Sequence, residues 1–114
     1  MGRNLTDERR EAILAAHENN PDDLGPALGA LVMNGNIPVE TVSLLLAVSP
    51  PTVYRWMYGE RRPRDIDKIK KVTRLLNALR IAQSAGQLPL QGTSQERTNA
   101  LVAILSSRTA AKAQ

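Results

Sequence analysis

Cysteine and phenylalanine are absent from this chain of 114 residues, which has only one tryptophan, two tyrosines and one histidine. Without cysteine, the chain forms no disulfide and no thiolate metal site, which suits a reducing cytosol. Because aromatic residues are so few, a buried core must consist mainly of Leu, Val, Ile and Ala. No apolar run is long enough to cross a membrane and no signal-peptide pattern is present, so we expect a cytoplasmic protein.

Patterns typical of catalytic sites are also missing. The single histidine, His17, has no nucleophile motif beside it and is expected to be an ordinary surface or partly buried side chain. The chain has no glycine-rich loop to hold a phosphate and no cluster of metal ligands. The sequence therefore predicts no enzymatic activity, no cofactor and no metal site.

Helical periodicity runs through most of the chain. No stretch alternates Val, Ile or Thr with polar residues over the length of a strand, so we expect an all-α protein. Helices are expected over residues 7–19, 24–34, two short segments within 38–59, 65–85 and 93–108, with a frayed tail over 109–114. Thr6 is the expected cap of the first helix, and Thr93 with Glu96 forms a capping box for the last. Gly25, Pro26 and Gly29 argue against a regular first turn of the second helix.

Apolar residues recur at helical spacing within these segments and should form the core. They are Ile13, Leu14 and Ala16 in the first helix; Leu24, Leu28, Leu31 and Val32 in the second; Ile66, Ile69, Val72, Leu76 and Leu79 in the fifth; and Leu101, Ile104 and Leu105 in the sixth.

Residues 38–64 contain the most informative pattern in the chain. Val42, Leu45 and Leu46 form an apolar face at one-turn spacing. Pro38 suits a first helical position. Ser49 is a natural N-cap for a second short helix that begins at Pro50. Gly59 follows the last turn and can adopt the left-handed conformation that ends a helix.

This spacing resembles the helix-turn-helix of the phage repressor and Cro-like family. The family's apolar positions are occupied here by Val42, Leu46, Val48, Val53 and Trp56, and its small residue by Ser43. Ala47 replaces the usual turn glycine. The run 56–64 also resembles the end of that family's recognition helix and the loop after it. The resemblance implies a DNA-binding domain of about five helices over residues 1–85, with the motif at 38–59, and an additional loop, helix and tail over 86–114.

Charge changes sign along the chain at the expected recognition helix. Residues 1–54 contain three basic and seven acidic residues, whereas residues 55–80 contain nine basic and three acidic residues. A basic segment at this place suits a polyanion such as double-stranded DNA.

The resemblance assigns roles to individual side chains. Base recognition in the major groove is expected from Arg55, Thr52, Tyr54 and Pro51, with Arg55 the best match to the two acceptors of guanine. Phosphate contacts are expected from Ser49, Tyr58, Arg61, Arg62, Arg64, Lys70, Lys71 and Arg74. A solvated basic helix face is the alternative explanation for Lys68, Lys70, Lys71 and Arg74. Trp56 is expected in the core.

Three classes of function fit these features. The first is a small, repressor-like phage or bacterial transcription regulator that binds a specific DNA sequence. The second is a DNA-packaging or recombination accessory, such as a small terminase subunit or an excisionase. The third is an interaction protein that uses the motif only as a scaffold. The last helix either folds back on the domain or forms a homodimer through Leu101, Ile104 and Leu105.

Overall fold

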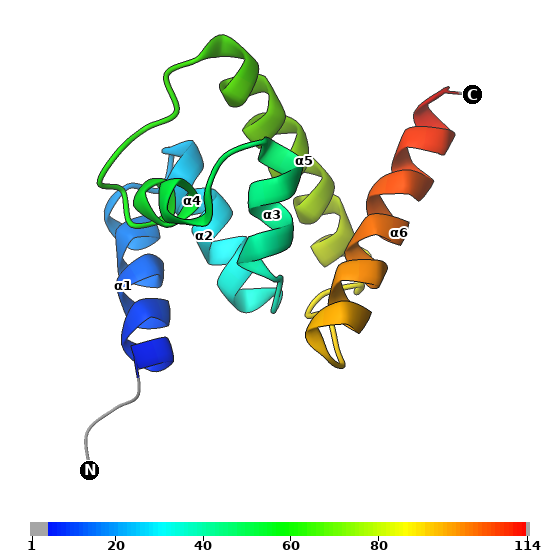
Figure 1. Cartoon of the computed structure of the whole chain (residues 1–114), viewed down its shortest axis with the longest axis horizontal. Helices are drawn as coiled ribbons and strands as arrows, with labels where there is room; N and C mark the ends of the chain where they lie inside the picture. Colours follow the sequence, from blue (N-terminus) through cyan, green and yellow to red (C-terminus); the bar gives the residue numbers. More distant parts are fainter. Residues whose placement is uncertain (1–4, 114) are drawn as a thin grey trace.

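Six helices make up the regular structure of the computed structural model, which describes the backbone of residues 5–113 and the side chains of residues 7–106. They are α1 (Leu5–Asn19), α2 (Leu24–Asn34), α3 (Val39–Leu46), α4 (Pro50–Met57), α5 (Ile66–Ser84) and α6 (Ser94–Ala113), as shown in Figure 1. Residues 5–113 contain no strand, and the all-α prediction is confirmed.

The core is aliphatic, as the scarcity of aromatic residues requires. Helices α1 to α5 surround it, and α6 lies along one side of the domain (Figure 1). Trp56 is 6% exposed and belongs to this core, as expected. The largest side chains that are fully buried are Ile13, Leu28, Val32, Val42, Leu46, Val53, Met57, Val72, Leu79 and Leu101.

Two glycines let α2 pack very closely against its neighbours. A Cβ atom at Gly25 would overlap the carbonyl oxygen of Trp56 and lie 2.7 Å from its carbonyl carbon. A Cβ atom at Gly29, one turn later, would lie 2.5 Å from Cγ2 of Ile13 and 2.9 Å from Cβ of Met57. These glycines, which have low helix propensity, therefore form the face of α2 that contacts α1 and α4.

Two apolar residues expected in the core are exposed instead. Leu45 is 39% exposed. Val42 and Leu46 form the side of α3 that faces the core, and Leu45 lies about 100° from Leu46 around the helix. Ile66 is 68% exposed, because it is the first residue of α5 and precedes the buried stripe that begins near Val72.

Helix boundaries differ from the expected ones in three places. Pro38 is the N-cap of α3 rather than its first residue, because its extended ψ of 122° places it just outside the helix. α1 begins at Leu5, so Thr6 lies inside the helix and is not its cap; the Thr6 side chain lies outside the described residues. α6 continues to Ala113, beyond the expected end near Arg108, because no glycine or proline interrupts the sequence there.

α6 is attached to the domain through the corner between α2 and α3. The capping box is confirmed, since the Glu96 amide donates to Thr93 Oγ1 at 3.1 Å and the Thr93 amide donates to Glu96 Oε1 at 3.3 Å. Arg97 donates to the backbone and side-chain oxygens of Asn36 at 3.0 and 3.1 Å. Asn36 in turn donates to the Leu90 carbonyl at 3.0 Å.

Leu101 fixes the first half of α6 against the core. Its side chain is fully buried, and Ile104 and Leu105 are half-buried against the same core. Within the described chain, α6 therefore folds back on the domain. A homodimer remains a prediction, but Leu101 is not accessible to a second copy in this conformation.

The contact between α2 and α4 gives the first prediction. We expect Gly25→Ala to lower the free energy of unfolding by about 3 kcal/mol, because the new methyl group overlaps a backbone carbonyl that cannot move without α4. Urea denaturation measures this loss.

Gly29→Ala is the matched comparison, because both substitutions add one methyl group at successive turns of α2. The nearest atoms there are side-chain atoms of Ile13 and Met57 rather than a backbone carbonyl group, so we expect a smaller loss than at Gly25. A Gly25→Ala variant as stable as the parent would show that the two helices are not held at this distance.

Candidate nucleic-acid interface

The turn between α3 and α4 is held by local hydrogen bonds. Ser49 is the N-cap of α4, as expected: its hydroxyl accepts from the Thr52 amide at 3.4 Å and lies 2.9 Å from the Thr52 hydroxyl. Pro50 is the first helical residue. Gly59 has a φ of +79°, the left-handed conformation expected of it. Ser43, the small residue of α3, is buried and donates to the Glu40 carbonyl at 2.7 Å.

Ala47 adopts a backbone conformation that glycine usually occupies. It ends α3 with φ +58° and ψ +44°, in the left-handed region. Lys68 supports this turn from α5, because its Nζ donates to the carbonyl oxygens of Leu46 and Ala47 at 3.2 and 3.1 Å. The turn therefore forms with alanine in the left-handed region, which strains the backbone.

α4 buries one face and presents the opposite one to solvent. Val53, Trp56 and Met57 point into the core. Pro51 and Arg55, one turn apart, lie on the outer face and are exposed. Both side chains therefore extend away from the core.

Thr52 and Tyr54 lie on the two flanks of α4, each half-buried. The Tyr54 ring is covered by Arg9 of α1, whose Cζ lies 4.5 Å from the ring centroid. The Tyr58 ring lies next to it, with centroids 6.3 Å apart. Hydrogen bonding to the Tyr54 side chain raises the pKa of Arg9 above its ordinary value, although partial burial acts in the opposite direction. Sequence patterns did not indicate Arg9, because it lies 45 residues before its partner.

The loop after α4 arches away from the helix toward the start of α5 (Figure 1). It encloses an open hollow of about 1000 Å³, called here the α4–loop hollow. Its lining includes Thr52, Arg55 and Trp56 of α4, the loop residues 59–65, and Lys68 of α5. Arg61 and Arg64 are exposed there, so this flank of α4 is basic.

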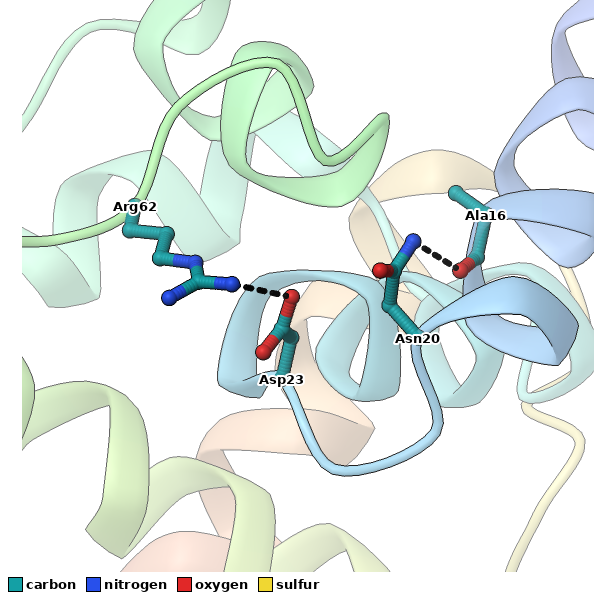
Figure 2. A network of polar contacts seen from close by, with 4 residues as sticks. All are labelled: Ala16, Asn20, Asp23 and Arg62. Carbon is teal, nitrogen blue, oxygen red and sulfur yellow. Dashed lines mark hydrogen bonds and ion pairs between the residues drawn. The ribbon is translucent and has the colours of Figure 1, made fainter.

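Arg62 is partly neutralised by an acidic partner. Figure 2 shows its guanidinium directed at Asp23, the N-cap of α2, with an N–O distance of 3.3 Å. Nearby, the side chain of Asn20 donates to the Ala16 carbonyl at 3.1 Å and closes the end of α1 (Figure 2). Since the Arg62 side chain is 76% exposed, the ion pair is weak and can exchange its partner.

The basic residues in the first half of α5 form two groups with different surroundings. Lys68 donates to carbonyl groups at the end of α3 and so stabilises the fold, a role that the sequence did not indicate. Lys70, Lys71 and Arg74 are exposed and do not line the α4–loop hollow. Their phosphate contacts remain a prediction.

His17 lies apart from the face that carries Arg55. It is half-buried in a separate hollow of about 240 Å³, which also contains Arg80 and Gln83. Its Nδ1 is buried without a hydrogen-bond partner. In the described part of the chain, no group of three acidic or histidine side chains could hold a metal ion.

Comparisons with protein-family models, with curated proteins and with solved structures found no match. Among the described residues, no helix combines the length and the apolar character needed to cross a membrane.

The strained turn gives the second prediction. We expect Ala47→Gly to raise the free energy of unfolding by about 0.5 to 1 kcal/mol, because relief of the left-handed strain exceeds the added entropy of the unfolded chain. Thermal or urea denaturation measures the change.

Ala85→Gly is the control, since Ala85 also follows a helix but has a φ of −83° and no left-handed strain. This variant should be less stable than the parent. Equal effects at both positions would contradict the role assigned to Ala47.

Proposed function

We propose that this chain is a sequence-specific double-stranded DNA-binding protein, a small repressor-like transcription regulator of a phage or bacterium, that inserts α4 into the major groove. The observation that carries the proposal is the position of Arg55. It extends from the outer face of a short helix whose opposite face is fixed in the core and whose flank adjoins an arginine-rich loop.

Dimensions and chemistry support this interpretation. An α-helix with its side chains is about as wide as the major groove of B-DNA, roughly 12 Å. The Arg55 guanidinium offers paired donors for O6 and N7 of guanine. Pro51 offers only an apolar surface, which suits a thymine methyl group. Thr52 would lie at the edge of the major groove, and its hydroxyl is already hydrogen-bonded to the Ser49 hydroxyl.

Contacts to the DNA backbone are assigned mainly to Arg61 and Arg64, with Arg62 added when it leaves Asp23. The amino end of α4 contributes less, because Pro50 and Pro51 have no amide hydrogen and the Thr52 amide is bonded to Ser49. We therefore assign Ser49 mainly a structural role as the N-cap of α4, and a phosphate contact only as a secondary role.

The oligomeric state separates this proposal from a role in DNA packaging. The burial of Leu101 against the domain leaves a smaller apolar surface on α6 for assembly. We therefore expect size-exclusion chromatography with light scattering to show a monomer or a dimer. A closed ring of many copies would instead support a small-terminase-like function.

DNA recognition is tested by selecting bound sites from random duplexes. We expect the parent to select a defined sequence, and Arg55→Ala to lose preference at one base position at a cost of about 1–3 kcal/mol. If Arg55→Ala selects the same sequence as the parent, Arg55 does not recognise a base.

Arg61→Ala is the control for charge alone. We expect it to weaken binding to all sequences and to make the salt dependence shallower. Contacts with four to six phosphates predict a slope of roughly −4 to −5 in a plot of log affinity against log salt for the parent. No binding of any duplex at low salt would exclude both DNA-binding functions and favour an interaction protein.

A further inference from the structure

The two flanks of α4 carry positive charge from different parts of the chain. Successive residues of a helix are about 100° apart, so Thr52 and Tyr54 lie on opposite sides of the exposed Pro51–Arg55 face. The Thr52 flank borders the α4–loop hollow, with Arg61 and Arg64. The Tyr54 flank borders Arg9, which comes from α1.

Arg9 is held on this flank by aromatic side chains. Its guanidinium lies over the face of Tyr54 at 4.5 Å, and the Tyr58 ring extends the same surface by one helical turn. A guanidinium stacked on an aromatic ring keeps donors at its edge for a further acceptor. The groups that act on Arg9 in the described residues are tyrosines, which leave its positive charge in place, whereas Arg62 contacts a carboxylate.

The geometry of a DNA groove matches this arrangement. The major groove is bounded by two phosphate backbones, one on each side of an inserted helix. A helix with cations along both flanks can contact both strands, whereas one with a single basic flank contacts one strand. In the proposed function, Arg61 and Arg64 contact the strand beside the loop, and the second strand lies beside the Tyr54 flank.

We propose that Arg9, positioned by Tyr54 and Tyr58, binds a backbone phosphate on the strand across α4 from Arg61 and Arg64. This inference rests on the proposed function. It makes α1 part of the interface and makes Tyr54 a positioning residue, in place of the base-recognition role expected from the sequence.

Binding of the selected duplex over a range of salt concentrations tests the proposal. Each phosphate contact contributes about 0.9 to the slope of log affinity against log salt. We expect Arg9→Ala to make this slope shallower by about 0.9, and Arg9→Lys to restore most of the slope because it keeps the charge.

Arg10→Ala is the matched control. It removes the same charge from the neighbouring position of α1, where the guanidinium donates to the Met33 carbonyl at 2.6 Å and to Asn34 Oδ1 at 3.0 Å at the end of α2. Its slope should equal that of the parent. The slope of log affinity against log salt depends on the number of phosphate contacts. A lower folding stability of either variant would therefore not produce the expected difference between the slopes of Arg9→Ala and Arg10→Ala.

Ethylation of individual phosphates then locates the contact. We expect Arg9→Ala and Arg61→Ala to lose interference on opposite strands of the groove. An unchanged slope for Arg9→Ala, or an equal decrease for Arg10→Ala, would overturn the proposal while leaving DNA binding intact. If the parent binds no duplex, the proposed function itself fails.

Discussion

The backbone contact between α2 and α4 is the constraint on which the arrangement of this protein depends. Because Gly25 has no Cβ atom, α2 approaches the Trp56 carbonyl until backbone meets backbone, and Gly29 allows close contact with the side chains of Ile13 and Met57. α4 is thus held against α2 by a backbone contact at Gly25 in addition to its own buried side chains, Val53, Trp56 and Met57. In the proposed function this support matters, because base recognition requires side chains placed to within a fraction of an ångström.

Contacts between distant residues then fix the end of α3 and the position of α6. Lys68 binds the carbonyl groups of Leu46 and Ala47 and so stabilises a turn in which Ala47 has a left-handed conformation. At the other end of the domain, Arg97 and Asn36 join α6 to the corner between α2 and α3. These polar side chains satisfy backbone groups that the ends of short helices leave unpaired. Such contacts help to stabilise short helices around a core that is mostly aliphatic.

The candidate interface combines local features with others that arise only from packing. Arg55 and Pro51 share the outer face of α4 because four residues make about one helical turn, and the arginines of 61–64 follow directly in the chain. Arg9 reaches Tyr54 only because α1 packs beside α4. Similarly, Asp23 draws Arg62 toward α2 although 39 residues separate them. Side chains with the same charge therefore differ in what they can bind.

Local sequence patterns were enough to predict the helices, their main caps and the outer face of α4. Ser49, Thr93 and Gly59 act through neighbours in the chain, and a period of 3.6 residues decides which side chains share a face. The exposure of Leu45 and Ile66 and the role of Gly25 depended on tertiary structure. Only the packed fold decides how closely two helices approach and which part of an apolar stripe another element covers, because those distances join residues that are far apart in the chain.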